Sequence, residues 1–272
     1  MKDILIHVRD FEKHTPAGFF GTRLAATLGA SVTGVYACPQ PLYIAPSFEP
    51  ELMTEAIQNA RELVKDAVQA RQSFLDWTAS LGVPQSEWVV AEGAVSDALA
   101  QAATRHDLLV LDHAEDDDGA AWDIPGVILK TGIPCIVLPH HGVHYTPFER
   151  IAIGWNGSPE AMRAVHAALP FLQGKQALLL WGEERGLYQG VDWDPPFNIM
   201  DYLRRHGVAA EQRNVTAKHD DVGAVLLEEA MKFRSELLVM GAYGRSRFSE
   251  WMLGGATRHV LTWADVPVLL RH

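Results

Sequence analysis

Short apolar runs alternate along the chain with segments of helical periodicity. In the second half, strand-like runs fall near 150–155, 176–181, 209–215, 236–241 and 266–271. Helical segments lie between them at 158–173, 195–206, 221–234 and 250–263. Ser158 followed by Pro159 predicts the N-cap and first residue of one helix. This alternation is typical of a parallel sheet covered by helices on both faces.

The two halves of the 272-residue chain resemble each other. The matched pairs are residues 3–8 with 150–155, 106–112 with 235–241, and 132–138 with 265–270. A repeat changes the number of domains that the sequence predicts. We therefore expect an α/β protein with two repeated, doubly wound, five-stranded parallel-sheet domains at 1–140 and 149–272. Residues 141–148 are the expected linker, because Pro and Gly occur at this junction.

The first half differs by a longer second helix at about 51–80. Apolar residues recur there at helical spacing: Leu52, Ala56, Ala60, Leu63, Ala67, Ala70 and Phe74. We expect this stripe to face the core.

Composition narrows the class of protein. Hydrophobic residues make up 48% and charged residues 21%, which is usual for a folded soluble protein. The net charge of −11, without a dense Lys/Arg run, argues against a nucleic-acid partner. The chain lacks an apolar stretch of about 20 residues and a signal-peptide pattern at its start, so we expect no membrane anchor and a cytoplasmic protein. Cys38 and Cys135 are expected to be buried, reduced thiols.

The segment after the fourth strand of the second half carries candidate binding residues. In open α/β sheets, ligands bind where strands end at a reversal of strand order. Gly241 and Gly244 would let backbone N–H groups turn toward an anion, and Arg245 and Arg247 add positive charge. The remaining candidates are Gly254, Gly255 and Thr257, which would open the next helix with free N–H donors and one hydroxyl. The alternative is a tight turn whose glycines only allow close packing.

The spacing Gly241-x2-Gly244-x9-Gly254 resembles the G-2x-G-9x-G-(S/T) signature of ATP-binding universal stress proteins. The closing strand at 265–270 and the opening at 151–165 are also similar to that family. The second half carries the resemblance strongly, the first half as a divergent copy. The resemblance implies a tandem member with an adenine-nucleotide alpha-hydrolase-like fold.

This resemblance implies a ligand and its contacts. Gly241, Gly244, Gly254 and Thr257 hold positions that contact ribose and phosphates in the family, so ATP or another adenine nucleotide, with Mg²⁺, is the expected ligand. Asn156 stands where ATP-binding members usually have Asp, and Gly255 replaces the first Ser/Thr. Trp155 and Trp181 could stack on adenine, although aromatic residues near strand ends more often serve the core.

The first half departs further from the signature. Asp112 matches Gly241, and the acidic run 113–119 replaces the glycine loop. Carboxylates repel phosphate, so we expect a lost nucleotide pocket in this half. Two metal sites stay open as alternatives: Mg²⁺ or Ca²⁺ at residues 116–118, and an ion between His140 and His144.

Three functional classes follow. The first is a stress-response regulatory module that binds an adenine nucleotide. The second is a slow ATP hydrolase, for which the acids near the pocket are Asp192, Asp194, Asp220 and Asp221. The third is a signalling scaffold without a ligand. The apolar closing strands of the halves are expected to pair, within the chain as a pseudo-dimer or between chains as a homodimer.

Overall fold

A computed structural model describes most of the chain. The described residues are 1–38, 50–113, 123–141, 143, 145–182, 198–216, 221–242 and 255–272, with the side chains of 50–53 excluded. They form two compact units, Met1–Ile133 and Pro134–His272. The predicted limits at 1–140 and 149–272 stay a prediction; the contacts assign residues 134–140 to the second unit.

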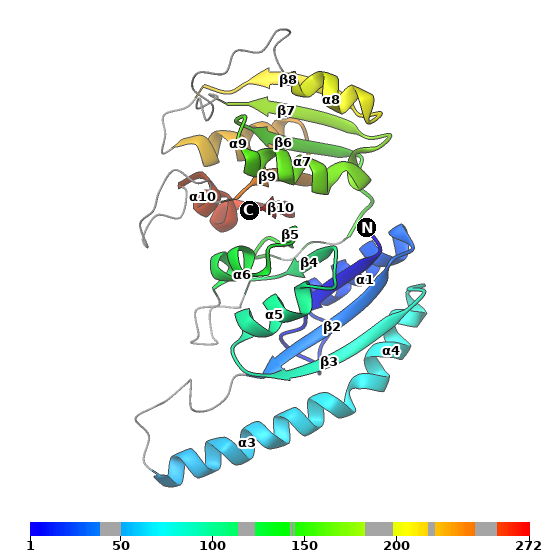
Figure 1. Ribbon diagram of the computed structural model, residues 1–272, viewed down its shortest axis with the longest axis vertical. Coiled ribbons are helices and arrows are strands. Elements are labelled where there is room, and N and C mark those ends of the chain that lie inside the picture. Colours follow the sequence, from blue (N-terminus) through cyan, green and yellow to red (C-terminus); the bar gives the residue numbers. More distant parts are fainter. Residues whose placement is uncertain are drawn as a thin grey trace. The chain divides into compact units, whose positions relative to one another are not determined.

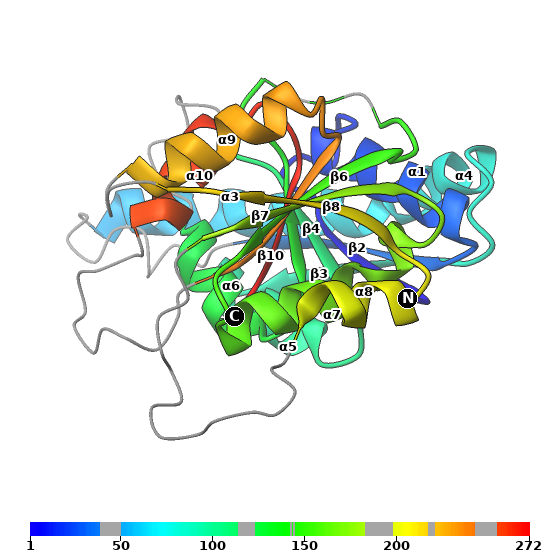
Figure 2. The same cartoon turned by 90° about the horizontal axis from the view of Figure 1, so that it is seen from above.

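The first unit alternates strands and helices (Figure 1). Its elements are β1 (Asp3–His7), α1 (Pro16–Leu28), β2 (Ser31–Cys38), α3 (Pro50–Gln69), α4 (Arg71–Ser80), β3 (Ser86–Glu92), α5 (Val95–Ala103), β4 (Leu108–Leu111) and α6 (Ile124–Thr131). The strands are parallel and lie in the order β3-β2-β1-β4. Helices α1 and α4 cover one face of this sheet, and α5 and α6 cover the other (Figure 2). The α/β class is confirmed.

The long helix expected at 51–80 is two helices that meet at an angle (Figure 1). The indole of Trp88 donates a hydrogen bond to the Ala67 carbonyl at 2.7 Å. In an uninterrupted helix that carbonyl would accept from Arg71, the first residue of α4, so the indole breaks the ladder at this point. The expected core stripe is only partly right: Ala67 and Phe74 are buried, but Leu63 is 40% exposed.

The second unit repeats the alternation. Its elements are β5 (Cys135–Val137), β6 (Arg150–Trp155), α7 (Pro159–Leu172), β7 (Gln176–Trp181), α8 (Ile199–Arg205), β8 (Ala209–Asn214), α9 (Val222–Lys232), β9 (Leu237–Gly241), α10 (Gly255–Trp263) and β10 (Val268–Arg271). Helices α7 and α8 lie on one face of the sheet, and α9 and α10 on the other (Figure 2). All five strands predicted for this half are confirmed.

The sheet of the second unit includes the closing strand of the first repeat. Its order is β5-β10-β9-β6-β7-β8. The described pairings are parallel except that of β5 with β10, which is antiparallel with Ile136 opposite Leu269. The closing strands of the two repeats are therefore hydrogen-bonded to each other.

The repeat extends to the caps of the first helix in each half. Thr15 precedes Pro16, and its hydroxyl accepts a hydrogen bond from the Gly18 N–H at 3.2 Å. Ser158 precedes Pro159, and its hydroxyl accepts from the Ala161 N–H at 3.1 Å. The predicted Ser158 cap is confirmed. Both helices, which follow the first strand of their repeat, thus begin with the same capped turn.

Both cysteines, Cys38 and Cys135, are buried and not joined in a disulfide, as expected from their spacing. In the part of the chain that the structure describes, no helix is long and apolar enough to cross a membrane.

Candidate functional site

The strand order of the second unit reverses between β6 and β9. From β6 the chain proceeds to β7 and β8, whereas β9 leads to β10 on the other side. Gly154 of β6 lies opposite Met240 of β9, so Trp155 and Gly241 follow at the same edge. This is the place where ligands bind in open α/β sheets. The register therefore brings the predicted site residues Asn156 and Gly241 to one edge of the sheet.

Asn156 shapes the loop between β6 and α7. Its side-chain oxygen accepts a hydrogen bond from the Ser158 N–H at 3.2 Å, and Gly157 has a φ of 71°. This is an Asx turn, in which a side chain replaces a backbone partner. Asn156 is exposed at the carboxyl edge. Asn156 therefore contributes to the loop itself as well as to the candidate site.

Gly241 lies against the first turn of α7. A Cβ at this position would stand 2.5 Å from the Ala161 nitrogen and 2.7 Å from the Glu160 carbonyl carbon. These are backbone atoms of a capped helix and have little freedom to move. The absence of a side chain at Gly241 therefore permits close packing of β9 on α7, which was the alternative reading of this glycine.

The N-terminus of α10 is placed by packing on α9. A Cβ on Gly223 would lie 2.9 Å from the Ala256 carbonyl oxygen, so a glycine is needed where the two helices approach. Gly255 is exposed, and a Cβ there would meet no atom within 4 Å. Thr257 is 4% exposed. The described start of α10 therefore has open space beside Gly255, and the buried Thr257 follows two residues later.

The other predicted site residues, Gly244, Arg245, Arg247 and Gly254, lie outside the described residues. The same holds for residues 116–118 and for His144, which belong to the two alternative metal sites. Three of the acids weighed for hydrolysis, at 192, 194 and 220, are also outside. Among the described residues, no group of three or more His, Cys, Asp or Glu side chains is placed to hold a metal ion.

In the first unit the position that matches Gly241 is filled by a carboxylate. Asp112 is 2% exposed and follows β4. One of its oxygens accepts from the Arg9 Nε at 2.7 Å, and the other accepts from the Ala17 N–H at 3.0 Å. Ala17 lies in the first turn of α1, where free N–H groups attract anions. The chain thus supplies its own anion at this edge of the first unit.

Each half buries an acid at this edge, but the acid comes from a different element in each half. In the second unit the strand end is Gly241, and the first turn of α7 carries Glu160, which is 3% exposed. Its carboxylate pairs with Arg163, with Nη1 and Oε1 3.3 Å apart. In the first unit Asp112 is on the strand side and Ala17 on the helix side. The repeated Thr-Pro and Ser-Pro sequences could have shown that the first turns of α1 and α7 correspond. No sequence motif marks the roles of Arg9 and Glu160.

His7 is the last residue of β1 and is 3% exposed. Burial, and secondarily the charge of Arg9, lower its pKa from 6.5 to about 3. The imidazole is therefore neutral in the folded protein at physiological pH.

A pH-dependent loss of stability follows from His7. Between pH 6.5 and about 3 the unfolded chain binds a proton that the folded chain rejects, so stability falls as the pH falls through this window. Going from pH 7 to pH 5, this group alone is expected to remove about 2 kcal/mol. Urea unfolding at both pH values should show that His7→Asn loses less stability than the wild type. Equal losses in the two proteins would contradict a neutral buried His7.

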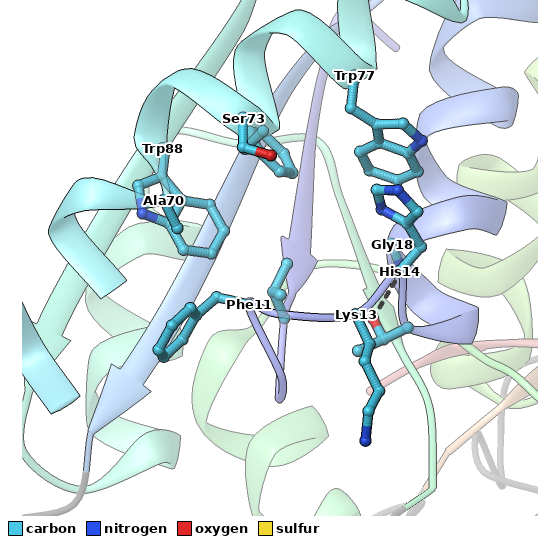
Figure 3. A pocket seen from close by; sticks show the side chains of 11 residues that line it. Phe11, Lys13, His14, Gly18, Ala70, Ser73, Trp77 and Trp88 are labelled. Atoms are coloured by element: carbon cyan, nitrogen blue, oxygen red, sulfur yellow. Dashed lines mark hydrogen bonds between the residues drawn. The ribbon is translucent and has the colours of Figure 1, made fainter. Parts of the chain in front are cut away.

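A small hollow opens in the first unit between the loop after β1 and helix α4 (Figure 3). Its aromatic walls include Phe11, Trp77 and Trp88, and His14 stacks on Trp77 with ring centroids 4.2 Å apart. Lys13 and Ser73 also line it. The cavity volume of about 30 Å³ has room for a water molecule but is far smaller than an adenine ring requires.

Residues 183–272 match the model of the universal stress protein family. Among solved structures, a universal stress protein from Archaeoglobus fulgidus DSM 4304 is 13% identical, with 99% of this chain and 97% of that chain covered and a TM-score of 0.69. A protein of unknown function from Pseudomonas aeruginosa PAO1 is 11% identical, with coverage of 99% and 92% and a TM-score of 0.57.

A universal stress protein solved in complex with cAMP covers 51% of this chain and 96% of its own, at 14% identity and a TM-score of 0.35. That likeness is too low to support an argument about a ligand. No curated protein matches the chain. At these identities the solved structures establish the fold alone. Residues 183–272 therefore match the universal stress protein family model, and the chain has the fold of the universal stress protein from Archaeoglobus fulgidus over 99% of its length.

Proposed function

We propose that the protein is a regulatory module that binds one adenine nucleotide, ATP with Mg²⁺, at the carboxyl edge of its second unit. The observation that carries the proposal is the contrast between the two halves. In the first unit the carboxylate of Asp112 fills the anion position beside Arg9 and Ala17. In the second unit α10 starts at Gly255 with open space around it. Helix N-termini of this kind attract phosphate groups.

The proposal explains why one nucleotide is expected per chain. The residues proposed to form its site are Asn156, Gly241, Gly244, Arg245, Arg247, Gly254, Gly255 and Thr257. The two arginines supply positive charge to a chain whose net charge is −11. Because Gly241 also packs on α7, we assign it to positioning the loop that follows rather than to phosphate contact.

Calorimetric titration tests the proposal. The purified chain is titrated with ATP, ADP, AMP and cAMP, with and without Mg²⁺, and ATP is expected to bind at one site per chain. A matched pair of variants adds the same charge at two places. Gly255→Asp should weaken ATP binding at least tenfold because it puts a carboxylate at the open start of α10. Ala209→Asp, on the exposed strand β8, should leave binding unchanged. Absence of heat with every nucleotide would remove the proposal.

Slow hydrolysis of ATP is the second candidate. Hydrolysis requires a metal ligand, a positioned water and groups that stabilise charge on the phosphoryl oxygens. Of the four acids considered, Asp221 precedes α9, and the other three lie outside the described residues. Phosphate release above that of a Gly254→Asp control would favour the hydrolase.

The hydrogen-bonded closing strands support a further part of the proposal. The antiparallel pairing of β5 with β10 is the feature expected of a pseudo-dimer formed by the two repeats within one chain. We propose this arrangement, with a homodimer as the alternative that light scattering would detect. We also propose that the protein acts in the cytoplasm, where its two buried cysteines would stay reduced.

A further inference from the structure

An unpaired donor lies at the candidate site. Trp155 is the last residue of β6 and is 4% exposed. Its indole Nε1 is buried and has no hydrogen-bond partner among the residues that the structure describes. Buried donors in folded proteins are nearly always satisfied, because an unmade hydrogen bond is expensive. Such an exception calls for an acceptor that arrives from outside the chain.

The position of Trp155 agrees with a binding role. Gly154 packs toward Met240 of β9 and Leu226 of α9. Neighbouring residues of a strand point to opposite faces, so Trp155 points to the face covered by α7 and α8. Its ring lies 6.5 Å from that of Trp181, the last residue of β7, at an interplanar angle of 58°. Two indoles from adjacent strands thus meet at the carboxyl edge, next to Asn156.

Within the described ranges of the second unit, a second unpaired donor does not share this position. The Ser235 hydroxyl is also buried and unpaired, but Ser235 precedes β9 and therefore lies at the opposite end of the strands. A hydroxyl can also rotate to find weak partners, whereas an indole N–H has a fixed direction. In the described part of the second unit, Trp155 is therefore the unsatisfied donor at the ligand-binding edge.

We propose that Trp155 recognises the base of the bound nucleotide by donating its indole N–H to a ring nitrogen. This inference rests on the proposed function and adds a selectivity determinant to it. An indole N–H only donates, so it selects a heteroaromatic ring with an acceptor in its plane. Adenine offers N1, N3 and N7 as such acceptors. The face of Trp181 supplies apolar contact for the same ring.

The inference is tested with nucleotides that each lack one ring nitrogen. The 1-deaza, 3-deaza and 7-deaza analogues of ATP replace that nitrogen by C–H and keep the shape of the base. We expect one analogue to bind the wild type about tenfold more weakly than ATP, and the other two to bind about equally to ATP. Trp155→Phe should bind ATP about as weakly as the wild type binds that analogue. In Trp155→Phe, ATP and that analogue should bind equally well, so the penalty for the missing ring nitrogen disappears. The four affinities together form a thermodynamic cycle.

Trp181→Phe is the matched control, because it makes the same change in a neighbouring indole and should keep the penalty. An NMR spectrum of the ¹⁵N-labelled indoles gives a readout that does not require a folded variant at position 155: one indole N–H signal should shift downfield when ATP is added. The inference is wrong if ATP binds and all three analogues bind as well as ATP, or if the penalty persists in Trp155→Phe. Absence of ATP binding by the wild type would instead remove the proposed function.

Discussion

Replacing Gly241 by alanine is expected to destabilise the protein by about 2–4 kcal/mol, as measured by urea unfolding. The added Cβ would come to 2.5 Å from the Ala161 nitrogen and 2.9 Å from the Glu160 Cβ. To relieve these short contacts, the first turn of α7 must move away from β9. That turn is held by the Ser158 cap and buries Glu160. The cost therefore includes strain and a weakened helix start.

Gly154→Ala is the matched control on the neighbouring strand. A Cβ there would lie 3.5 Å from the Met240 Cβ and 3.6 Å from the Leu226 methyl groups, which is ordinary contact. Alanine also loses less conformational entropy than glycine on folding. The control should be neutral or slightly stabilising. Equal stability of the two variants would show that Gly241 does not mark a close approach.

Replacing Asp112 by alanine is expected to destabilise the protein by about 2–4 kcal/mol. Asp112 has a side chain 3% exposed, and its partner Arg9 has a side chain 19% exposed. Removal of the carboxylate would leave the Arg9 guanidinium and the Ala17 N–H without this acceptor. Buried charged groups that lose their partner account for much of the cost in such variants. Urea unfolding of Asp112→Ala checks the prediction.

Asp97→Ala provides a control for the same substitution at the surface. Asp97 pairs with Lys130 at 2.8 Å, but the two side chains are 69% and 51% exposed. Exposed pairs of this kind contribute about 0–1 kcal/mol. If Asp112→Ala cost no more than Asp97→Ala, the carboxylate would not serve as the internal anion of the first unit.

Much of the fold could be predicted because local pattern and packing agree. The strands at 150–155 and 176–181 match β6 and β7 because continuous apolar runs are required when a strand is buried on both faces. The start of α7 was readable from Ser158 and Pro159 because capping is local.

Features that depend on distant contacts could not be predicted in the same way. The break between α3 and α4 depends on the indole of Trp88, which lies 21 positions from Ala67. The antiparallel partner of β5 comes from the other repeat, and no local signal identifies it. Helical spacing wrongly placed Leu63 in the core. Periodicity shows which residues share a helix face, but it does not show how much of that face is covered by the rest of the protein.

For the candidate site too, the sequence predicted some features, whereas others depended on distant contacts. Its location followed from the repeat and from the rule that ligands bind at strand ends. The acid at position 112 was visible as an obstacle to phosphate, but its hydrogen bonds to Arg9 and Ala17 required the fold. Gly241 fitted a phosphate loop by its spacing, and the structure adds a packing role that spacing alone could not distinguish.

The pairing of β5 with β10 determines where the chain can be cut. A fragment that starts at residue 149 would lack Cys135–Val137 and would leave the backbone N–H and C=O groups of Val268–Leu270 unpaired along one side. Exposed strand edges of this kind recruit other chains and promote aggregation. A fragment that starts at Pro134 keeps the strand that protects this edge. Dissection of the two repeats should therefore follow the hydrogen-bond pattern rather than the Pro- and Gly-rich junction.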